Sequence, residues 1–416
     1  MSVRDLLAVL DDHEARRRRT VSLVASENLL SPACRRALAS DVGHRYVMPP
    51  EDARPPGMWD YPNQSSMREL LARAEELACA RLHGEVADVR PLSGNGAAAI
   101  LLTSALDEGG TVASVPAACG GHFATAALCK RFGLRRFDLP YDDARGIVDV
   151  REAARLCAAE RVDLVFLDAS TQLFPHPVRA LREALPARTR IVYDASHAMG
   201  LIASGRFQDP LGEGADAIQG STHKSLFGPQ KGLFVFRDRA SDLARRVLEA
   251  TIPLFVSNVH PHHVLALAIA LAETAEFGGA YADRVVENAR SLGAALHALG
   301  FDILFPEHDF SASHQLVCAV GSKPEALRLF DRLEAAGVYV NLVSVPHRHE
   351  TYGFRIGVAE AARRGMGPSA MRAIAELFAA ARDASLPDLA ARVAPRVAAL
   401  SSDFPGVAFC HPEGGG

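Results

Sequence analysis

The segment QGSTHKSLFGPQKG, residues 219–232, indicates the fold more directly than any other part of the chain. It follows a short apolar run and places Lys224 between Ser-Thr-His and a Gly-Pro turn. Open α/β sheets bind ligands at the carboxyl ends of their strands. A lysine held partly desolvated there would have a lowered pKa and could form a Schiff base. On this segment alone, a lysine in a surface loop is an equally open interpretation.

The residues around this segment alternate between short apolar runs and helical patterns. The runs expected to form strands are 111–115, 162–168, 190–194, 217–220 and 232–236. The helical patterns, with apolar residues three and four apart, cover 67–82, 96–105, 123–131, 150–159 and 178–184. This alternation predicts an α/β fold whose mostly parallel sheet is buried on both faces.

The pattern changes after residue 255. Helices are expected at 264–276, 284–299, 323–336 and 369–381, and strands at 315–320, 338–341 and 353–358. These elements predict a second, smaller α+β unit. We therefore expect an N-terminal arm over residues 1–30, a large domain over 31–274 and a small C-terminal domain over 275–416.

The composition is that of a globular protein. Of the 416 residues, 49% are hydrophobic and 23% charged, with a formal net charge of −4. This charge does not favour nucleic-acid binding, and the longest apolar stretch, 264–272, is about half of the ~20 residues that a membrane span needs. The N-terminus shows no apolar segment of the signal-peptide type, and the seven cysteines form no Cys-X-X-Cys pair. We expect a cytoplasmic protein that binds neither nucleic acid nor a membrane.

Two other segments supply groups that a phosphate-bearing cofactor needs. Residues 190–200, RIVYDASHAMG, place Asp194 at the end of an expected strand, where it could pair with a protonated pyridine nitrogen or cap a helix. Residues 91–99, PLSGNGAAA, form a turn before an alanine-rich helix, whose free N–H groups can hold a phosphate. The turn matches neither a Walker A loop nor the Gly-X-Gly-X-X-Gly motif. Together with Lys224, and in this order, the segments favour pyridoxal phosphate.

The chain resembles serine hydroxymethyltransferase and its relatives among the fold type I pyridoxal-phosphate enzymes over nearly its whole length. The matching stretches are LVASENLLSP (23–32), RY (45–46), PLSGNGA (91–97), GGH (120–122), DASHAMGL (194–201), STHKSLFGP (221–229) and FRIG (354–357). The resemblance implies a mostly parallel, seven-stranded type of sheet in the large domain and the cofactor pyridoxal 5′-phosphate. It also implies a homodimer or higher homo-oligomer, because this family builds its site between two subunits.

The resemblance further implies a role for each matching residue. Lys224 would carry the cofactor, Asp194 would pair with its pyridine nitrogen, and His197 would lie near its ring hydroxyl. The other implied contacts are Ser93, Gly94 and Asn95 at the phosphate, Ser170 on the far side of the cofactor, Ser221, Thr222 and His223 beside the lysine, Ser26 and Arg355 at the substrate carboxylate, and Tyr46 from the neighbouring subunit.

Some positions depart from the family pattern in ways that affect folate. Met48 stands where the family has a glutamate that assists one-carbon transfer to tetrahydrofolate, and a thioether cannot exchange a proton. Val343 stands where an asparagine contacts folate, and Gln230 replaces an arginine. Because a hydrogen bond to a charged group contributes about 1.5 to 3 kcal/mol, these changes predict weak folate binding.

Other departures lie near the expected cofactor. Cys119 falls where a histidine stacks on the ring, so either Cys119 or His122 would cover it, unless Cys119 is a buried apolar residue. Asn258 and His260 replace the glycine pair that reaches the phosphate from the partner subunit. The neighbouring histidines 262 and 263, and the 347–350 segment, match no spaced zinc motif, so we expect no metal site.

The expected activity is that of an L-threonine transaldolase or aldolase that does not use folate. It would cleave a β-hydroxy-α-amino acid to a glycyl quinonoid and add this to a second aldehyde, in specialised metabolism. The proton shuttle would be His122, Tyr46, Lys224 or water. Three alternatives stay open: a folate-dependent serine/glycine hydroxymethyltransferase with an altered pterin site in which Glu51 replaces the missing glutamate, a racemase or decarboxylase, and a non-catalytic interaction protein with the same fold.

Overall fold

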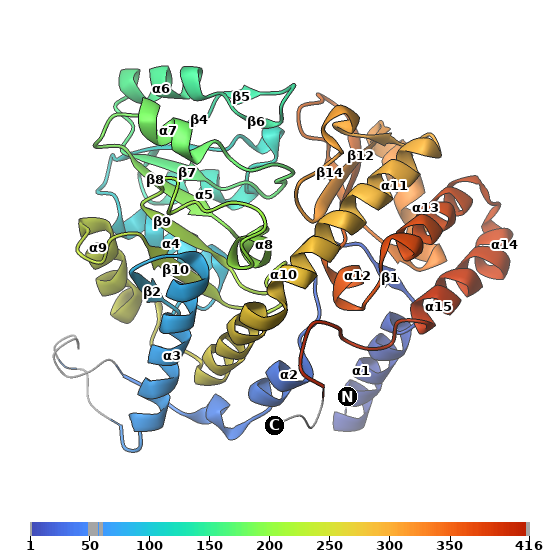
Figure 1. Ribbon diagram of the computed structural model, residues 1–416, viewed down its shortest axis with the longest axis horizontal. Helices are drawn as coiled ribbons and strands as arrows, with labels where there is room; N and C mark the ends of the chain where they lie inside the picture. Colours follow the sequence, from blue (N-terminus) through green and yellow to red (C-terminus); the bar gives the residue numbers. More distant parts are fainter. Residues whose placement is uncertain (1, 49–56, 58–60, 413–416) are drawn as a thin grey trace. The chain divides into compact units, whose positions relative to one another are not determined.

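The computed structural model describes residues 2–48, 57 and 61–412 (Figure 1). The chain divides into two compact units. The large unit comprises Leu30–Ala282 with Cys410–Gly416, and the small unit comprises Met1–Leu29 with Asp283–Phe409. The domain limits expected from the sequence, at residues 30 and 274, stay a prediction. The chain passes from the large unit to the small unit between Ala282 and Asp283, within helix α10 (Pro261–Ala298).

A seven-stranded sheet forms the centre of the large unit, in the order β2-β10-β9-β8-β7-β3-β4. Neighbouring strands from β9 to β4 pair in parallel, whereas β10 pairs antiparallel with both β2 and β9. The strands are β2 (Val86–Asp88), β3 (Thr111–Ser114), β4 (Arg135–Asp138), β7 (Leu164–Leu167), β8 (Arg190–Asp194), β9 (Ala217–Ser221) and β10 (Gly232–Phe236). The expected α/β fold with a mostly parallel sheet is confirmed.

Both faces of this sheet are buried. On β7, Val165 and Leu167 belong to one hydrophobic cluster, and Leu164 and Phe166 belong to another. Because successive side chains of a strand point to opposite faces, the two clusters lie on the two sides of the sheet. The strands are therefore continuously apolar, as in other sheets covered by helices on both faces.

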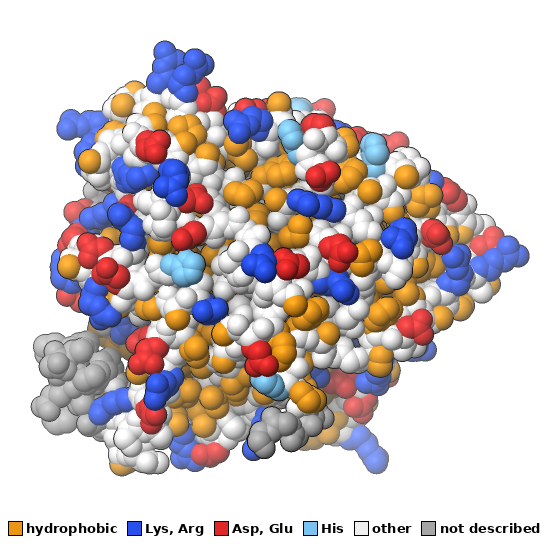
Figure 2. All heavy atoms as spheres, in the orientation of Figure 1, with side chains coloured by type: hydrophobic (Ala, Val, Ile, Leu, Met, Phe, Trp, Pro, Cys, Tyr) orange, Lys and Arg blue, Asp and Glu red, His pale blue; other side chains and the backbone are white. Residues whose placement is uncertain are grey.

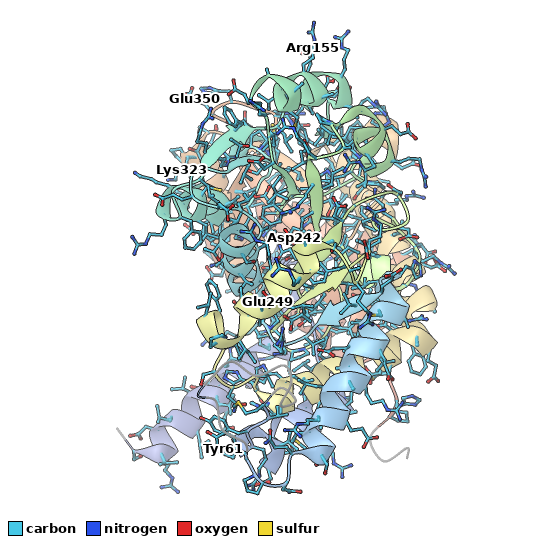
Figure 3. The ribbon with its side chains drawn as sticks, turned by 90° about the vertical axis from the view of Figure 1, so that its left-hand side faces the viewer. Tyr61, Arg155, Asp242, Glu249, Lys323 and Glu350 are labelled. Atoms are coloured by element: carbon cyan, nitrogen blue, oxygen red, sulfur yellow. The ribbon has the colours of Figure 1, made fainter. Side chains whose placement is uncertain are left out.

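Helices cover the two faces of the sheet. Residues of α3, α6, α7, α8 and α10 join the first cluster, and residues of α4, α5 and α9 join the second. The large-unit helices before α10 are α2 (Pro32–Leu38), α3 (Ser65–Leu82), α4 (Gly94–Ser104), α5 (Phe123–Arg131), α6 (Val150–Ala159), α7 (Val178–Ala184), α8 (Met199–Ala203) and α9 (Asp242–Ala250). On α9, Asp242 and Glu249 face outward (Figure 3), while Leu243 and Val247 are buried. A hairpin of β5 (Tyr141–Asp142) and β6 (Ile147–Val148) lies outside the main sheet.

Helix α10 is one continuous helix where the sequence suggested two. Gly278 and Gly279 interrupt the apolar pattern, but a Cβ at Gly278 would lie 2.6 Å from the Ser204 hydroxyl oxygen, so glycine permits close packing there. By length and composition alone α10 could cross a membrane. Val264, Leu267 and Leu271 are instead fully buried in the large unit's core, as in a core helix of a globular protein. The cytoplasmic location stays a prediction.

The small unit is an α+β unit. Its four-stranded antiparallel sheet has the order β11-β12-β15-β14, formed by β11 (Asp302–Ile303), β12 (Gln315–Gly321), β14 (Asn341–Ser344) and β15 (Tyr352–Gly357). Its helices are α1 (Val3–Arg17), α11 (Lys323–Ala336), α12 (Ala359–Arg363), α13 (Pro368–Asp383), α14 (Leu386–Asp388) and α15 (Ala394–Ser402), and β1 (Val21–Ser22) pairs in parallel with β13 (Val338–Tyr339). On the face drawn in Figure 2, acidic and basic side chains are interspersed.

Candidate active site

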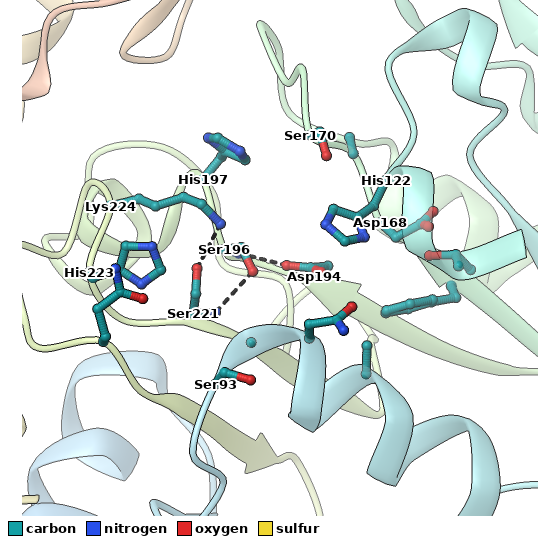
Figure 4. Close-up of a pocket in the computed structure, with 17 residues that line it drawn as sticks. Ser93, His122, Asp168, Ser170, Asp194, Ser196, His197, Ser221, His223 and Lys224 are labelled. Carbon is teal, nitrogen blue, oxygen red and sulfur yellow. Dashed lines mark hydrogen bonds between the residues drawn. The ribbon is translucent and has the colours of Figure 1, made fainter. Parts of the chain in front are cut away.

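A cavity of about 240 Å³ lies at the carboxyl ends of β7, β8 and β9, beside the N-terminus of α4 (Figure 4). Parallel strands present their carboxyl ends on the same edge, so three separate segments of the chain meet there. The cavity is lined by Ser93, Gly94, Asn95, Ala98, His122, Thr125, Phe166, Asp168, Ala169, Ser170, Asp194, Ser196, His197, Ser221, His223, Lys224 and Gln230.

The N-terminus of α4 forms one wall of the cavity. Ser93 caps this helix, and its hydroxyl accepts a hydrogen bond from the Gly96 N–H at 2.9 Å. A Cβ at Gly94 would lie 2.8 Å from both the Cβ and the backbone nitrogen of Ser221, so only glycine allows α4 and the end of β9 to approach this closely. The free N–H groups of the first turn can then bind an anion together with the helix dipole.

Lys224 lies in the turn that follows β9 and points into the cavity (Figure 4). Its Nζ donates a hydrogen bond to the Ser221 hydroxyl at 2.8 Å. The next side chain, His223, also lines the cavity, and burial followed by the charge of Lys224 lowers the pKa of its imidazole to about 4. His223 is therefore neutral at physiological pH. Thr222 is fully buried and donates to the Pro229 carbonyl at 2.6 Å, so it shapes the turn without lining the cavity.

Asp194 is the last residue of β8. Its two carboxylate oxygens accept hydrogen bonds from the Ser196 N–H at 2.7 Å and from the Gln219 side-chain amide at 2.6 Å. The following helix α8 begins at Met199 and is preceded by Ala198, so Asp194 does not cap it. A carboxylate fixed in this way at the cavity floor can pair with a cationic ring nitrogen. His197 is buried and also lines the cavity.

The segments after β3 and β7 form the opposite wall. His122 lines the cavity, and its backbone N–H donates to the Asp168 carbonyl at 2.9 Å. Ser170 lines it too, and its N–H donates to the Gly120 carbonyl at 2.8 Å. Cys119 is absent from the lining, and burial raises the pKa of its thiol to about 11, so the thiol is uncharged. Of the two candidates for covering a bound ring, His122 is the one at the cavity.

The residues expected to act from a neighbouring subunit lie on two segments, 45–46 and 258–260, which one hydrogen bond joins. The Asn258 side chain donates to the Arg45 carbonyl at 3.1 Å, next to Tyr46. Tyr46 is 45% exposed and stacks on Tyr61, with 5.0 Å between ring centroids; Figure 3 shows Tyr61 near the beginning of α3. His260 is exposed and has a positive φ of 52°. None of these side chains lines the cavity of its own chain.

The residues expected at the substrate carboxylate, Ser26 and Arg355, belong to the small unit. Arg355 lies on β15, and its Nη2 donates to the Asn341 side-chain oxygen on β14 at 2.6 Å. Burial lowers the pKa of its guanidinium to about 10, so it stays charged at neutral pH. Ser26 follows Ala25, whose backbone would be only 2.3 Å from a Cβ at Gly357, so both residues lie near the same end of β15.

Three further residues line the cavity although no sequence motif assigns them a role in the site: Asp168, Ser196 and Gln230. Asp168 could have been found by the same signal as Asp194, because both are acidic residues at the ends of apolar runs.

The cavity fits pyridoxal 5′-phosphate. The α4 N-terminus with Ser93 and Ser221 suits the phosphate, Asp194 suits the pyridine nitrogen, and Lys224 lies within the same cavity to hold the aldehyde carbon. The turn before α4 lacks the Gly-Lys-Ser/Thr loop of a Walker A nucleotide site.

Similarity to known proteins supports this interpretation of the cavity. The family model for serine hydroxymethyltransferase matches residues 1–378. The serine hydroxymethyltransferase of Methanopyrus kandleri is 37% identical over 391 residues, covering 91% of this chain and 88% of that protein. That of Cenarchaeum symbiosum is 35% identical and covers 98% and 95%. The crystal structure of L-threonine transaldolase from Pseudomonas fluorescens, in its internal aldimine state, matches with a TM-score of 0.93 at 30% identity, covering 98% and 93%. The chain belongs to the serine hydroxymethyltransferase family and is a pyridoxal-phosphate-dependent enzyme of fold type I.

Proposed function

We propose that this enzyme is an L-threonine transaldolase or aldolase that works without folate. It would break the Cα–Cβ bond of a β-hydroxy-α-amino acid and join the glycine fragment to a second aldehyde, in specialised metabolism. The similarity to the transaldolase structure over 98% of the chain supports this proposal. The observation that carries it is Met48, at the position where the family resemblance implies a glutamate.

Met48 is held in place by its backbone. Its N–H donates to the Gln64 side-chain oxygen, its carbonyl accepts from Arg68 Nε at 3.3 Å, and only 5% of the residue is exposed. A buried thioether neither donates nor takes up a proton. Glu51, the candidate from the sequence to replace the glutamate, lies outside the described residues.

Each site residue has its own role in the proposed reaction. Bound pyridoxal phosphate supplies the electron sink for cleavage next to Cα. Lys224 would hold the cofactor, Asp194 would keep its ring nitrogen protonated, and Arg355 would bind the substrate carboxylate through its planar fork. His122, Tyr46, Lys224 or water takes the hydroxyl proton, and His122 and Lys224 already lie at the cavity.

The second candidate is a folate-dependent serine/glycine hydroxymethyltransferase, which the curated relatives favour by name. The purified enzyme, loaded with cofactor, should be assayed with serine plus tetrahydrofolate, and with threonine plus aromatic, fluorinated and nucleoside-derived aldehydes. We expect acetaldehyde release from threonine and new β-hydroxy-α-amino acids. Folate-dependent serine cleavage faster than threonine cleavage would overturn the proposal.

Two controls complete this experiment. Lys224→Ala should lose both the cofactor's visible absorbance band and all turnover. Deuterium exchange at Cα of alanine, without cleavage of any β-hydroxy amino acid, would instead indicate racemase or decarboxylase chemistry.

We also propose that two subunits share each site, as in a homodimer or higher homo-oligomer. The absence of Tyr46, Asn258 and His260 from the cavity lining of their own chain supports this. Two inactive variants, Tyr46→Ala and Lys224→Ala, should regain activity when they are unfolded and refolded together, because a mixed dimer has one intact site. No recovery, with mixed dimers present by mass, would refute the shared site.

A further inference from the structure

Two carboxyl groups lie side by side at the floor of the cavity. Strands β7 and β8 pair in parallel with Leu167 opposite Tyr193, so the next residues, Asp168 and Asp194, are also opposite each other. Opposed residues of parallel strands point to the same face. Both residues line the cavity and are labelled in Figure 4.

Asp168 is a buried acidic residue. The residue is 1% exposed, and its Oδ1 accepts the Val115 N–H at 2.9 Å. Its buried Oδ2 has no hydrogen-bond partner within the described part of the chain. Burial, with a further contribution from Asp194, raises the pKa of Asp168 to about 7, against partial compensation by Thr125 and the Val115 N–H.

Two titratable side chains near Asp168, Cys129 and Tyr141, do not change charge in the neutral range. Burial raises the pKa of Cys129 on α5 to about 11 and raises that of Tyr141 on β5 far above neutral, so both stay uncharged. His122 contacts Asp168 through its backbone N–H. Asp194 accepts two N–H hydrogen bonds, as a carboxylate does. One buried carboxylate beside another favours the protonated form of the second.

We propose that Asp168 is a second carboxyl partner of the cofactor's pyridinium ring and that cofactor binding is coupled to release of the Asp168 proton. In the cofactor-free protein below about pH 7, Asp168 would carry a proton beside Asp194. The positive ring nitrogen then stabilises both carboxylates, the Asp168 O–H bond breaks, and its proton leaves to the solvent. This inference rests on the cofactor and not on which amino acid is cleaved.

The proposed proton release can be measured, because it changes the number of protons released on binding and the pH dependence of cofactor affinity. At about pH 6, a group with a pKa near 7 is mostly protonated, and its ionisation on binding releases nearly one proton per site. The same linkage weakens cofactor affinity by up to about tenfold for each pH unit below 7. The cofactor phosphate also titrates near pH 6, but this contribution is common to all variants.

The experiment uses the full-length, cofactor-free chain and 4′-deoxypyridoxine 5′-phosphate, which has no aldehyde and so makes no bond to Lys224. Titration calorimetry in two buffers of different ionisation enthalpy gives the number of protons released. We compare the unchanged protein, Asp168→Asn, and Asp107→Asn, which removes an exposed carboxylate that pairs with Arg246 at the surface. Unchanged protein and Asp107→Asn should release close to one proton more than Asp168→Asn.

A second measurement does not depend on the variant folding. A cofactor analogue whose ring nitrogen is replaced by carbon carries no ring charge, so the unchanged protein should release about one proton less on binding it than on binding the nitrogen-containing analogue. Equal proton release by Asp168→Asn and the unchanged protein would overturn the proposal. Equal release with the two analogues would overturn it as well.

Discussion

Lys231 carries an ammonium group inside the large unit, and its titration should change the stability of the protein. The residue is 1% exposed, and its Nζ donates to the carbonyls of Val259 at 2.9 Å, Arg90 at 3.2 Å and Pro91 at 3.3 Å. Burial lowers its pKa from 10.5 to about 7, with the neighbouring Asp88 opposing the shift. Arg90 and Pro91 lead directly into the phosphate turn, so this lysine also fixes the approach to the cofactor site.

The sign of the effect follows from proton binding. Between pH 7 and 10.5 the unfolded chain keeps the lysine proton and the folded chain does not. The free energy of unfolding therefore rises with pH in this window, by about 1.4 kcal/mol per pH unit. Between about pH 7.5 and 9.5 the contribution of Lys231 is about 2.7 kcal/mol.

The assay compares Lys231→Met with the unchanged protein, both free of cofactor, by urea unfolding at several pH values. The difference in free energy of unfolding between the two should grow with pH by about 1.4 kcal/mol per unit. Lys130→Met, which removes an exposed lysine at the end of α5, should run parallel to the unchanged protein. A Lys231→Met curve that is also parallel would refute the buried, deprotonating lysine.

Three further predictions concern single residues. Burial lowers the pKa of His176 from 6.5 to about 4. The contribution of neutral His176 to the free energy of unfolding is therefore present above pH 6.5 and is lost as the pH falls toward 4. His176→Phe should abolish about 3 kcal/mol of this loss, as measured by urea unfolding at several pH values. Gly94→Ala would place a Cβ 2.8 Å from Ser221 and should weaken cofactor binding at least tenfold, measured by fluorescence titration; unchanged affinity would contradict the tight approach. Arg355→Lys loses the planar fork and should raise the amino-acid KM by about tenfold to a hundredfold, more than it lowers kcat, as measured by steady-state kinetics.

The sequence predicted those parts of the fold whose signal is local. The apolar runs that became β8 and β10 were predicted with their observed bounds, because strands buried on both faces are continuously apolar. The short edge strands β2 and β4 were missed. β4 has the sequence Arg-Arg-Phe-Asp and is partly exposed, and charged residues are typical of an edge strand, so its composition gives no strand signal.

The residues of the candidate site were likewise predictable only where their signal is local in the sequence. Lys224 and Asp194 were predicted because each follows a strand directly and because both lie in family motifs. The shifted pKa values of Asp168 and Lys231 could not be predicted, because they arise from burial by residues that are distant in sequence. Burial raises the pKa of Asp168, and it lowers that of Lys231, whose Nζ is enclosed by the carbonyls of Val259 and Arg90. Strand order and burial decide which ionisable groups carry a charge, and that information exists only after the chain has folded. The proton chemistry of this enzyme therefore follows from its tertiary structure, whereas its cofactor could be predicted from three short segments.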